Sequence, residues 1–430
     1  MSVWAIFISF GLYLFLSVPI GVSIGLAVMT YMVLDGESWR YVATNLFAAV
    51  DSFPLMAIPF FVLSGALMER GGLSLRLVNF ANSLIGHING GLAFVAVITC
   101  LFFGAISGSS PATVAAIGSI MVPFMVRAGY PKSFALGLIA AAGCLGVIIP
   151  PSIPMIMFGV ATGASVSNLF MAGFLPGILC AFFLCVVAYI ICRRQGFNTA
   201  RGEGFSLANA WKEFKSAIWA LLVPIIILGG IYGGIFTPTE AAVVAVFYGL
   251  VAGVLIYREL DLAGIIDSLR STTVTTAMIM LIVGTGMTLG EVLAIQQVPT
   301  MVAESMRAWL DSTFGFLILV NLVLLVVGMI MDTTAAILIL SPILYPIAAM
   351  FGIDIIHFGI ILVINLAIGL ITPPVGLNLF TAKGLSDISL ERLIIGVLPF
   401  LFAMLISLAI ISFNDQVALF LPRLFGKIPW

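Results

Sequence analysis

The sequence is poor in charged residues. Only 8% of its 430 residues are Asp, Glu, Lys or Arg, whereas a soluble domain carries about 25%. A surface with so few charges cannot face water over its whole area, and 62% of the residues are hydrophobic. The composition therefore excludes an ordinary soluble enzyme or binding module. The net charge of −1 also argues against nucleic acid as a partner.

Reactive and metal-binding residues are equally scarce. The two histidines, His87 and His357, are far apart, and no Walker-type phosphate-binding motif occurs, so neither a zinc site nor ATP-driven transport is indicated. The five cysteines lie in or at the end of apolar segments without metal-ligand spacing, and we predict them to be small buried hydrophobic side chains. They are Cys100, Cys144, Cys180, Cys185 and Cys192.

Long apolar segments fill the chain instead. A membrane-spanning helix needs about 20 apolar residues, and the first run extends too far for a cleavable signal peptide. The sequence therefore predicts an all-α polytopic membrane protein. The expected simple crossings are 3–34, 45–68, 169–192, 217–234, 238–257, 271–293 and 391–413.

Four further apolar stretches are irregular. Segments 92–125 and 315–350 are too long for one crossing and are interrupted in their middles by polar residues. Segments 133–162 and 355–385 are each broken by a pair of prolines. We predict two re-entrant helical hairpins for the first pair and two helices unwound at mid-membrane for the second.

The distribution of lysine and arginine gives an orientation. The longest polar loop, 193–216, contains five of these residues and is placed in the cytoplasm; they are Arg193, Arg194, Arg201, Lys212 and Lys215. Alternating crossings then place 13 of the 17 Lys and Arg residues on the cytoplasmic side. Each hairpin must enter and leave by one face for this topology to hold. Segment 207–219 is amphipathic and is predicted to be a helix lying at the membrane interface.

A repeat at a constant offset of 223 residues is the most informative feature. It pairs Pro123 with Pro346, Gly129 with Gly352, Gly146 with Gly369, Ile148 with Ile371, Pro150–Pro151 with Pro373–Pro374, and Pro176 with Pro399. Five predicted crossings separate equivalent points, and because five is odd the second copy is inverted. Inverted repeats with broken helices are typical of secondary transporters.

The proline pairs predict exposed backbone within the membrane. A proline pair removes two N–H donors and disfavours helix in the residue before it. Unpaired peptide groups are tolerated in hydrocarbon only beside protein or an aqueous cavity. We therefore expect 146–151 and 369–374 to offer carbonyl oxygens to a hard cation. The half-helix N-termini that follow favour an anion.

The hairpin tips, 104–113 and 328–335, carry the matching polar side chains. Under the offset, Ser109 corresponds to Asp332 and Ser110 to Thr333. Such hydroxyls either bind an ion or satisfy their own helix. An intramembrane carboxylate is costly and marks a functional site, so Asp332 is expected to face a cavity. Its role is left open between ion ligand, substrate contact and orientation of Thr333.

Three motifs resemble one protein family. The stretches 107–119, 148–154 and 371–376 are similar to those of the large membrane subunit of bacterial tripartite ATP-independent periplasmic (TRAP) transporters, and the resemblance covers essentially the whole chain. It implies a sodium-coupled importer in the inner membrane with an elevator-type fold similar to the ion-transporter superfamily. The scaffold would comprise 1–91, 163–314 and 386–430, and the transport domain 92–162 and 315–385.

The resemblance also implies partners and substrate. A periplasmic binding protein would deliver an organic-acid anion, and a small four-helix membrane subunit would brace the chain. We expect this subunit to be a separate chain because no such domain precedes Met1. The expected substrate is sialic acid, with C4-dicarboxylates or keto acids as the alternatives. A stand-alone sodium–dicarboxylate symporter, a channel and an intramembrane enzyme are the competing functions.

Site residues follow from the same resemblance, with Na⁺ as the co-transported ion and no organic cofactor. The first sodium site would use Ser107, Ser109, Ser110, Gly143, Gly146, Val147 and Pro150. The second would use Asp332, Thr333, Thr334, Gly369, Thr372 and Pro373. The substrate would contact Ser107, Ser109, Ser152 and Asp332.

Overall fold

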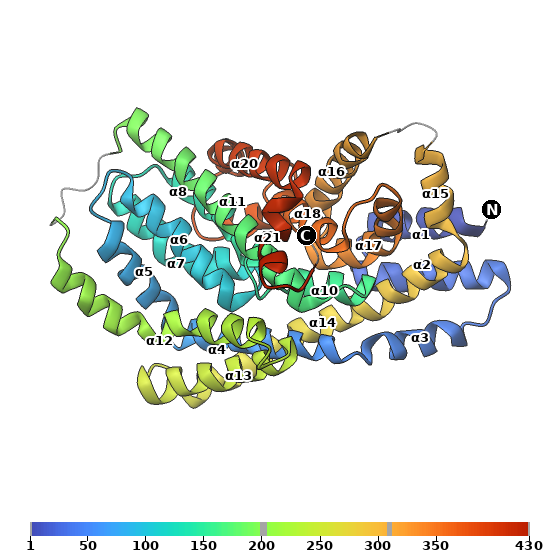
Figure 1. The fold of residues 1–430 in the computed structure, drawn as a ribbon, viewed down its shortest axis with the longest axis horizontal. Helices are drawn as coiled ribbons and strands as arrows, with labels where there is room; N and C mark the ends of the chain where they lie inside the picture. The colour runs from blue at the N-terminus through green and yellow to red at the C-terminus, as the bar shows by residue number, and fades with distance from the viewer. Residues whose placement is uncertain (1, 198–203, 308–311, 429–430) are drawn as a thin grey trace.

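The computed structural model describes residues 2–197, 204–307 and 312–428. Within these ranges every regular element is helical and no strand occurs. The described residues contain nine helices that are long and apolar enough to cross a membrane, or ten if one bent pair counts as a span. The prediction of an all-α polytopic protein is therefore confirmed. The molecule is elongated, with α3, α4, α13 and α14 along one long side (Figure 1).

The N-terminal region corrects two of the predicted crossings. Its elements are α1 (Ser2–Phe15), α2 (Ile20–Asp35), α3 (Arg40–Val50), the 3₁₀ turn η1 (Phe53–Met56), α4 (Ala57–Arg70) and α5 (Leu73–Ile85). The crossing at 3–34 is wrong because two helices, α1 and α2, pack against each other there. Pro19 lacks an N–H and disfavours helix at Val18, and Ser17 has φ +61°. The crossing at 45–68 is likewise interrupted between α3 and η1.

The first irregular block forms a hairpin followed by a broken helix, as predicted. Its helices are α6 (Gly91–Ser107), α7 (Ser110–Arg127), α8 (Lys132–Gly143), α9 (Leu145–Ile148) and α10 (Ile153–Thr162). Helices α6 and α7 pack together and meet at the two-residue tip Gly108–Ser109. The chain bends by 43° between α9 and α10, at Pro150–Pro151.

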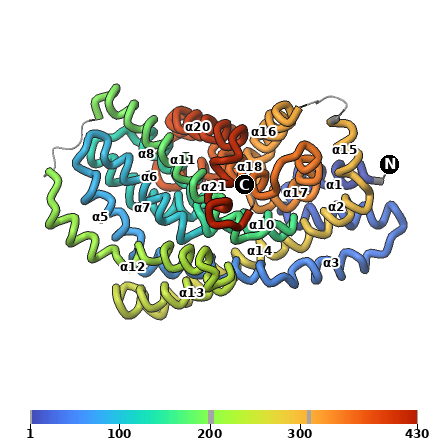
Figure 2. Tube along the Cα trace, viewed as in Figure 1, coloured from blue at the N-terminus to red at the C-terminus, as the bar shows by residue number. Residues whose placement is uncertain are grey.

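The second block repeats this pattern of elements. Its helices are α16 (Thr313–Ile330), α17 (Thr333–Met350), α18 (Ile355–Gly369) and α19 (Leu377–Lys383). Helices α7 and α17 have 18 residues each, and both ends of α17 lie 223 positions after those of α7. The break between α18 and α19 contains Pro373–Pro374. Helix α10 reaches from the first block onto α17 (Figure 2).

The remaining helices surround these blocks. They are α11 (Val166–Gln195), α12 (Leu207–Tyr232), α13 (Pro238–Leu250) with its π-helical continuation η2 (Val251–Ile256), α14 (Leu262–Ile295), α15 (Val298–Arg307), α20 (Leu390–Phe413) and α21 (Asp415–Leu424). The prediction of a separate interfacial helix at 207–219 is wrong, because α12 continues through this segment to Tyr232 without a break. Loop 193–216 is correspondingly shorter, and its Arg201 lies outside the described residues. Helices α5, α15 and α21 had not been predicted.

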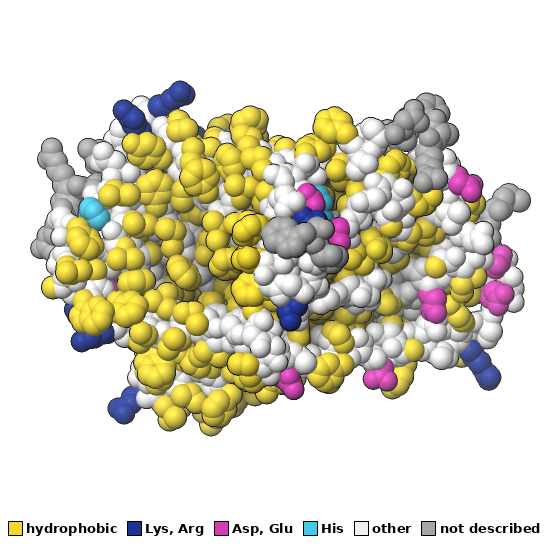
Figure 3. All heavy atoms as spheres, viewed as in Figure 1, with side chains coloured by type: hydrophobic (Ala, Val, Ile, Leu, Met, Phe, Trp, Pro, Cys, Tyr) yellow, Lys and Arg dark blue, Asp and Glu magenta, His cyan; other side chains and the backbone are white. Residues whose placement is uncertain are grey.

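The surface and core fit a lipid environment. In Figure 3 hydrophobic side chains cover much of the visible face, while the charged side chains lie mostly toward its edges and in one group near its middle. Phe182, Phe247 and Phe402 are examples of large apolar side chains that are more than half exposed. Four of the five cysteines are buried, which confirms the prediction for them. Cys185 is only half-buried.

Candidate functional site

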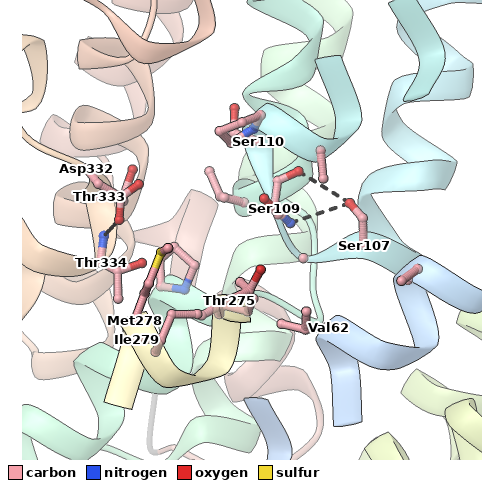
Figure 4. Close-up of a pocket in the computed structure, with 18 of the residues that line it drawn as sticks. Val62, Ser107, Ser109, Ser110, Thr275, Met278, Ile279, Asp332, Thr333 and Thr334 are labelled. Carbon is pink, nitrogen blue, oxygen red and sulfur yellow. Dashed lines mark hydrogen bonds between the residues drawn. The ribbon is translucent and has the colours of Figure 1, made fainter. Parts of the chain in front are cut away.

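A cavity of about 400 Å³ lies where the two hairpin tips meet. Figure 4 shows the first tip on one side, the second tip on the other, and residues of α14 beneath them. Helix α4 completes the wall. The polar lining side chains are Glu69, Ser107, Ser109, Ser110, Thr275, Asp332, Thr333 and Thr334.

The first tip is shaped by a glycine and a serine. Gly108 ends α6 with φ +60°, and the extended Ser109 begins α7. The Ser107 hydroxyl lies 3.3 Å from the Ser109 carbonyl oxygen and 2.9 Å from Thr113 Oγ1. Thr113 Oγ1 also donates to the Ser109 carbonyl, at 2.8 Å. Three oxygen atoms, two hydroxyls and one carbonyl, therefore gather at this tip.

The second tip carries a carboxylate and an unpartnered hydroxyl. Asp332 precedes α17, and its Oδ2 accepts a hydrogen bond from the backbone N–H of Thr334 at 2.9 Å. Asp332 therefore caps the helix and faces the cavity at once. Thr333 is buried, and its Oγ1 has no hydrogen-bond partner among the described residues. A buried unpaired hydroxyl is unusual, and it leaves an acceptor available to a ligand.

Each tip is fixed to the broken helix of its own block. A Cβ atom on Gly104 would lie 2.9 Å from Gly146 Cα, and one on Gly369 would lie 2.5 Å from Gly328 Cα. Only glycine permits such close approach of two backbones. Hydrogen bonds add to this docking: Ile153 N–H donates to the Gly108 carbonyl at 3.5 Å and Gly376 N–H to the Met329 carbonyl at 3.1 Å. The two donors are 223 positions apart.

Polar contacts also join the two blocks to each other. Asn378 on α19 donates through Nδ2 to Ser110 Oγ at 2.7 Å and to the Ala140 carbonyl at 3.1 Å. Cys144 Sγ donates to the Ala367 carbonyl at 3.1 Å. Cys144 and Ala367 are themselves separated by 223 positions, so equivalent points of the two blocks touch there.

The structure places the predicted site residues in two groups. Those on the cavity wall are Ser107, Ser109, Ser110, Val147, Asp332, Thr333 and Thr334. Those behind the wall, in or beside the two breaks, are Gly143, Gly146, Pro150, Ser152, Gly369, Thr372 and Pro373. Ser152 is fully buried; its Oγ donates to the Val147 carbonyl at 2.5 Å and accepts from Met155 N–H, which begins α10. Thr372 Oγ1 donates to the Ile368 carbonyl at 2.8 Å.

Sequence reasoning missed several contributors to the site. Helices α4 and α14 supply one wall, including Glu69 and Thr275, and Thr113 and Asn378 belong to the networks behind the tips. Two signals were available in the sequence. They are the carboxylate of Glu69 at the end of the apolar run of α4 and the amide of Asn378 at the second position of α19, because polar groups in apolar segments mark functional positions. The wall formed by α14 had no such signal, since it depends on packing between distant segments.

The oxygen atoms present suit a sodium ion better than a transition metal. Hard cations prefer hydroxyl, carbonyl and carboxylate oxygens, and these are the groups at both tips. Residues 146 and 369 must be glycine for the backbone of each break to reach its tip. The arrangement can therefore hold small cations beside a polar solute in a water-accessible cavity.

Comparison with known proteins gives a consistent result. The family described as "Tripartite ATP-independent periplasmic transporter, DctM component" matches residues 7–417. The C4-dicarboxylate TRAP transporter large permease protein DctM of Pseudomonas aeruginosa is 45% identical over 405 residues, covering 94% of each chain. The sialic acid TRAP transporter large permease protein SiaM of Vibrio cholerae is 39% identical over 413 residues, covering 96% of each.

A longer relative and a solved structure extend the comparison. The isethionate TRAP transporter permease protein DctMQ of Oleidesulfovibrio alaskensis is 44% identical over 416 residues; the match covers 96% of this chain but only 65% of that relative. The YdaH transporter of Alcanivorax borkumensis has a similar fold, with a TM-score of 0.60 at 18% identity and 87% of each chain covered. At that identity the likeness concerns the fold alone.

Proposed function

The chain belongs to the DctM family of TRAP transporters, and from this premise we propose that it is the transport subunit of a sodium-coupled importer of organic-acid anions. Membership makes it an inner-membrane permease and a secondary transporter rather than an enzyme. The observation that carries the proposal is the meeting of both hairpin tips at one polar cavity. An intramembrane site built from two broken helices is typical of secondary transporters.

Two sodium ions are proposed to bind behind the tips. The first tip offers the oxygens of Ser107, Ser109 and Thr113, and the second offers Asp332 together with the unpartnered Oγ1 of Thr333. Sodium at these points would hold each tip in place and offset the charge of an anion between them. Each ligand then increases the affinity for the other by the same factor.

We further propose that the two blocks form an inverted repeat and move together as an elevator. Support comes from the helix bounds of α7 and α17, which differ by 223 positions at both ends, and from the contact between Cys144 and Ala367, as expected of equivalent residues near a two-fold axis. The cavity extends to Glu69 at the end of α4. Arg70 is one of the 13 Lys and Arg residues that the charge distribution assigns to the cytoplasmic side, and on that assignment we propose that this arrangement is the inward-facing state.

The proposed partners are a small four-helix membrane subunit and a periplasmic binding protein. The isethionate relative exceeds this chain in length, as expected of a protein in which a second membrane domain is fused. Relatives are named for sialic acid, C4-dicarboxylates and isethionate, so the proposed substrate is a small organic-acid anion, with sialic acid as the first candidate.

Uptake into proteoliposomes tests the proposal. Vesicles containing this chain and its small subunit should accumulate labelled substrate only with an inward sodium gradient and the loaded binding protein outside. Uptake that continues without the binding protein would instead identify a stand-alone symporter. Ohmic ion currents would identify a channel, and turnover of a lipid substrate by the purified chain an enzyme.

Two variants test the site itself. Ser109→Ala and Asp332→Ala should each reduce uptake to background while expression and assembly with the small subunit stay normal, because the first removes a hydroxyl from the cavity wall at one tip and the second removes the carboxylate at the other. Glu391→Gln, an exposed residue on α20, is the control and should transport normally. Near-normal uptake by both tip variants would refute the assignment of the site to the tips.

A further inference from the structure

The two hairpin tips are equivalent in the repeat but are held differently. Ser110 at the first tip is fully buried, and its hydroxyl accepts a hydrogen bond from Asn378 Nδ2 at 2.7 Å. Thr333, its counterpart in the second tip, is also buried, but its Oγ1 has no partner among the described residues. Asn378 lies on α19, so the second block braces the first tip. The residue 223 positions before Asn378 is Met155, whose side chain has no N–H, and the first block therefore offers no equivalent brace to the second tip.

The Asn378 amide joins two parts of the first block. Its Nδ2 has two hydrogens; one is donated to Ser110 Oγ and the other to the Ala140 carbonyl oxygen at 3.1 Å. Ser110 begins α7 at the first tip, and Ala140 lies in the last turn of α8, just before the first break. Because a carbonyl oxygen can only accept, the bond to Ala140 fixes which way the amide is turned. The two bonds therefore hold the first tip against α8 in one relative position.

The same residue is tied to the second break. Asn378 is the second residue of α19, directly after the break. Its backbone N–H donates to the carbonyl oxygen of Leu370 at 3.0 Å. Leu370 follows α18 and lines the cavity, so this bond spans the turn that contains Pro373–Pro374. The position of Asn378 therefore depends on the conformation of the second break.

The second break is less well packed than the first. Residues 149–152 of the first break are all buried. In the second break Pro374 and Val375 are exposed, Val375 by 42%. A segment with few buried contacts opens at a lower cost in free energy. The second break therefore has the most to gain in order from a bound ion.

We propose that Asn378 is a positioning residue that couples the two sodium sites. This inference rests on the proposed function, in which the second ion binds at Asp332 and Thr333 beside the second break. That ion orders the break and fixes Asn378, whose amide then holds the first tip against α8. By linkage, the first ion increases the affinity for the second by the same factor. The two ions therefore bind cooperatively.

Equilibrium binding of radiolabelled Na⁺ to the detergent-purified complex with its small subunit provides the test. The titration is made without solute and at constant ionic strength, with choline replacing sodium. Asn378→Leu has nearly the same shape and lacks the amide. Asn378→Met introduces the residue type of Met155 and is the second version should leucine impair folding. Asn365→Leu is the matched control, because Asn365 is equally buried but its Nδ2 donates only within the second block, to the carbonyl oxygen and Oδ1 of Asn321 at 3.0 and 2.6 Å.

Wild type should bind two ions cooperatively. A coupling factor of about 20 lies within the usual range and gives two sites a Hill coefficient of about 1.6. Both Asn378 variants should still bind two ions, with a Hill coefficient of about 1 and a half-saturating sodium concentration about fourfold higher. Asn365→Leu should lower the thermal unfolding midpoint but keep the Hill coefficient of wild type, which separates coupling from a general loss of stability.

Three results would overturn the inference alone. They are non-cooperative binding of two ions by wild type, wild-type cooperativity in both Asn378 variants, and an equal loss of cooperativity in Asn365→Leu. A wild-type complex that binds fewer than two sodium ions would overturn the proposed sodium sites, and the inference with them.

Discussion

Replacing Gly146 by alanine should separate the first tip from its broken helix. A Cβ at this position would overlap Thr113 Oγ1 and lie 2.6 Å from the Ser109 carbonyl oxygen. Real carbon–oxygen contacts of this kind begin at about 3.3 Å, so the tip has to move by roughly 0.7 Å. The Ser109 oxygen belongs to the backbone and cannot rotate away, and the whole tip must therefore shift.

That movement exceeds the tolerance of an ion site, which is about 0.5 Å. Overpacking of this size costs about 1–3 kcal/mol of stability. Misplacement of about 1 Å can reduce function about a hundredfold, so we expect the sodium concentration for half-maximal stabilisation to rise about tenfold or more.

The assay is a sodium titration of the thermal unfolding midpoint, followed by uptake measurements. Gly229→Ala in α12 is the matched control, because nothing lies within 4 Å of its added Cβ. Alanine there should be neutral or stabilise the helix by up to about 1 kcal/mol. A Gly146→Ala complex with the sodium response and uptake of wild type would refute the placement of a sodium ion between the first tip and the first break.

Two further substitutions test the framework around the site. Asn378→Leu removes the hydrogen bond to Ser110 Oγ, which is fully buried, and should lower stability by about 1–3 kcal/mol; an unchanged unfolding midpoint would show that this link between the blocks is dispensable. Thr237→Ala breaks the capping box with Glu240 at the start of α13 and should cost about 1 kcal/mol in thermal unfolding while uptake stays normal, and lost uptake would contradict a purely structural role for this cap.

Features that depend on local sequence were predictable. The proline pairs fixed both helix breaks, because their effect on the backbone is independent of the surroundings. The glycine and serine residues at Gly108 and Ser109 marked the first tip, and the 223-residue offset located the second. The capping box of Thr237 and Glu240 at the start of α13 likewise follows from the three-residue spacing of a threonine and a glutamate before an apolar run.

Features that depend on packing were not predictable. The apolar run 3–34 is interrupted at Ser17, because Pro19 ends the helical conformation although the hydrophobic residues continue. Ser152 was expected to contact the substrate but lies buried at the start of α10. The neighbouring sequence does not show which way its hydroxyl points, so this burial could not be predicted. Thr275 reaches the cavity only because α14 packs beside the tips, and no local sequence pattern encodes that contact.

The length of α14 determines how deep the site lies. Its 34 residues extend for about 51 Å at 1.5 Å per residue, which is well beyond the roughly 30 Å of a hydrocarbon core. The apolar part from Val274 to Ile295 alone accounts for about 33 Å, so the hydroxyl-rich turns before it project among the lipid headgroups on the proposed cytoplasmic side. Thr275 then stands at the boundary of the hydrocarbon. A solute released from the tips past Thr275 would therefore have only a short path to water on that side.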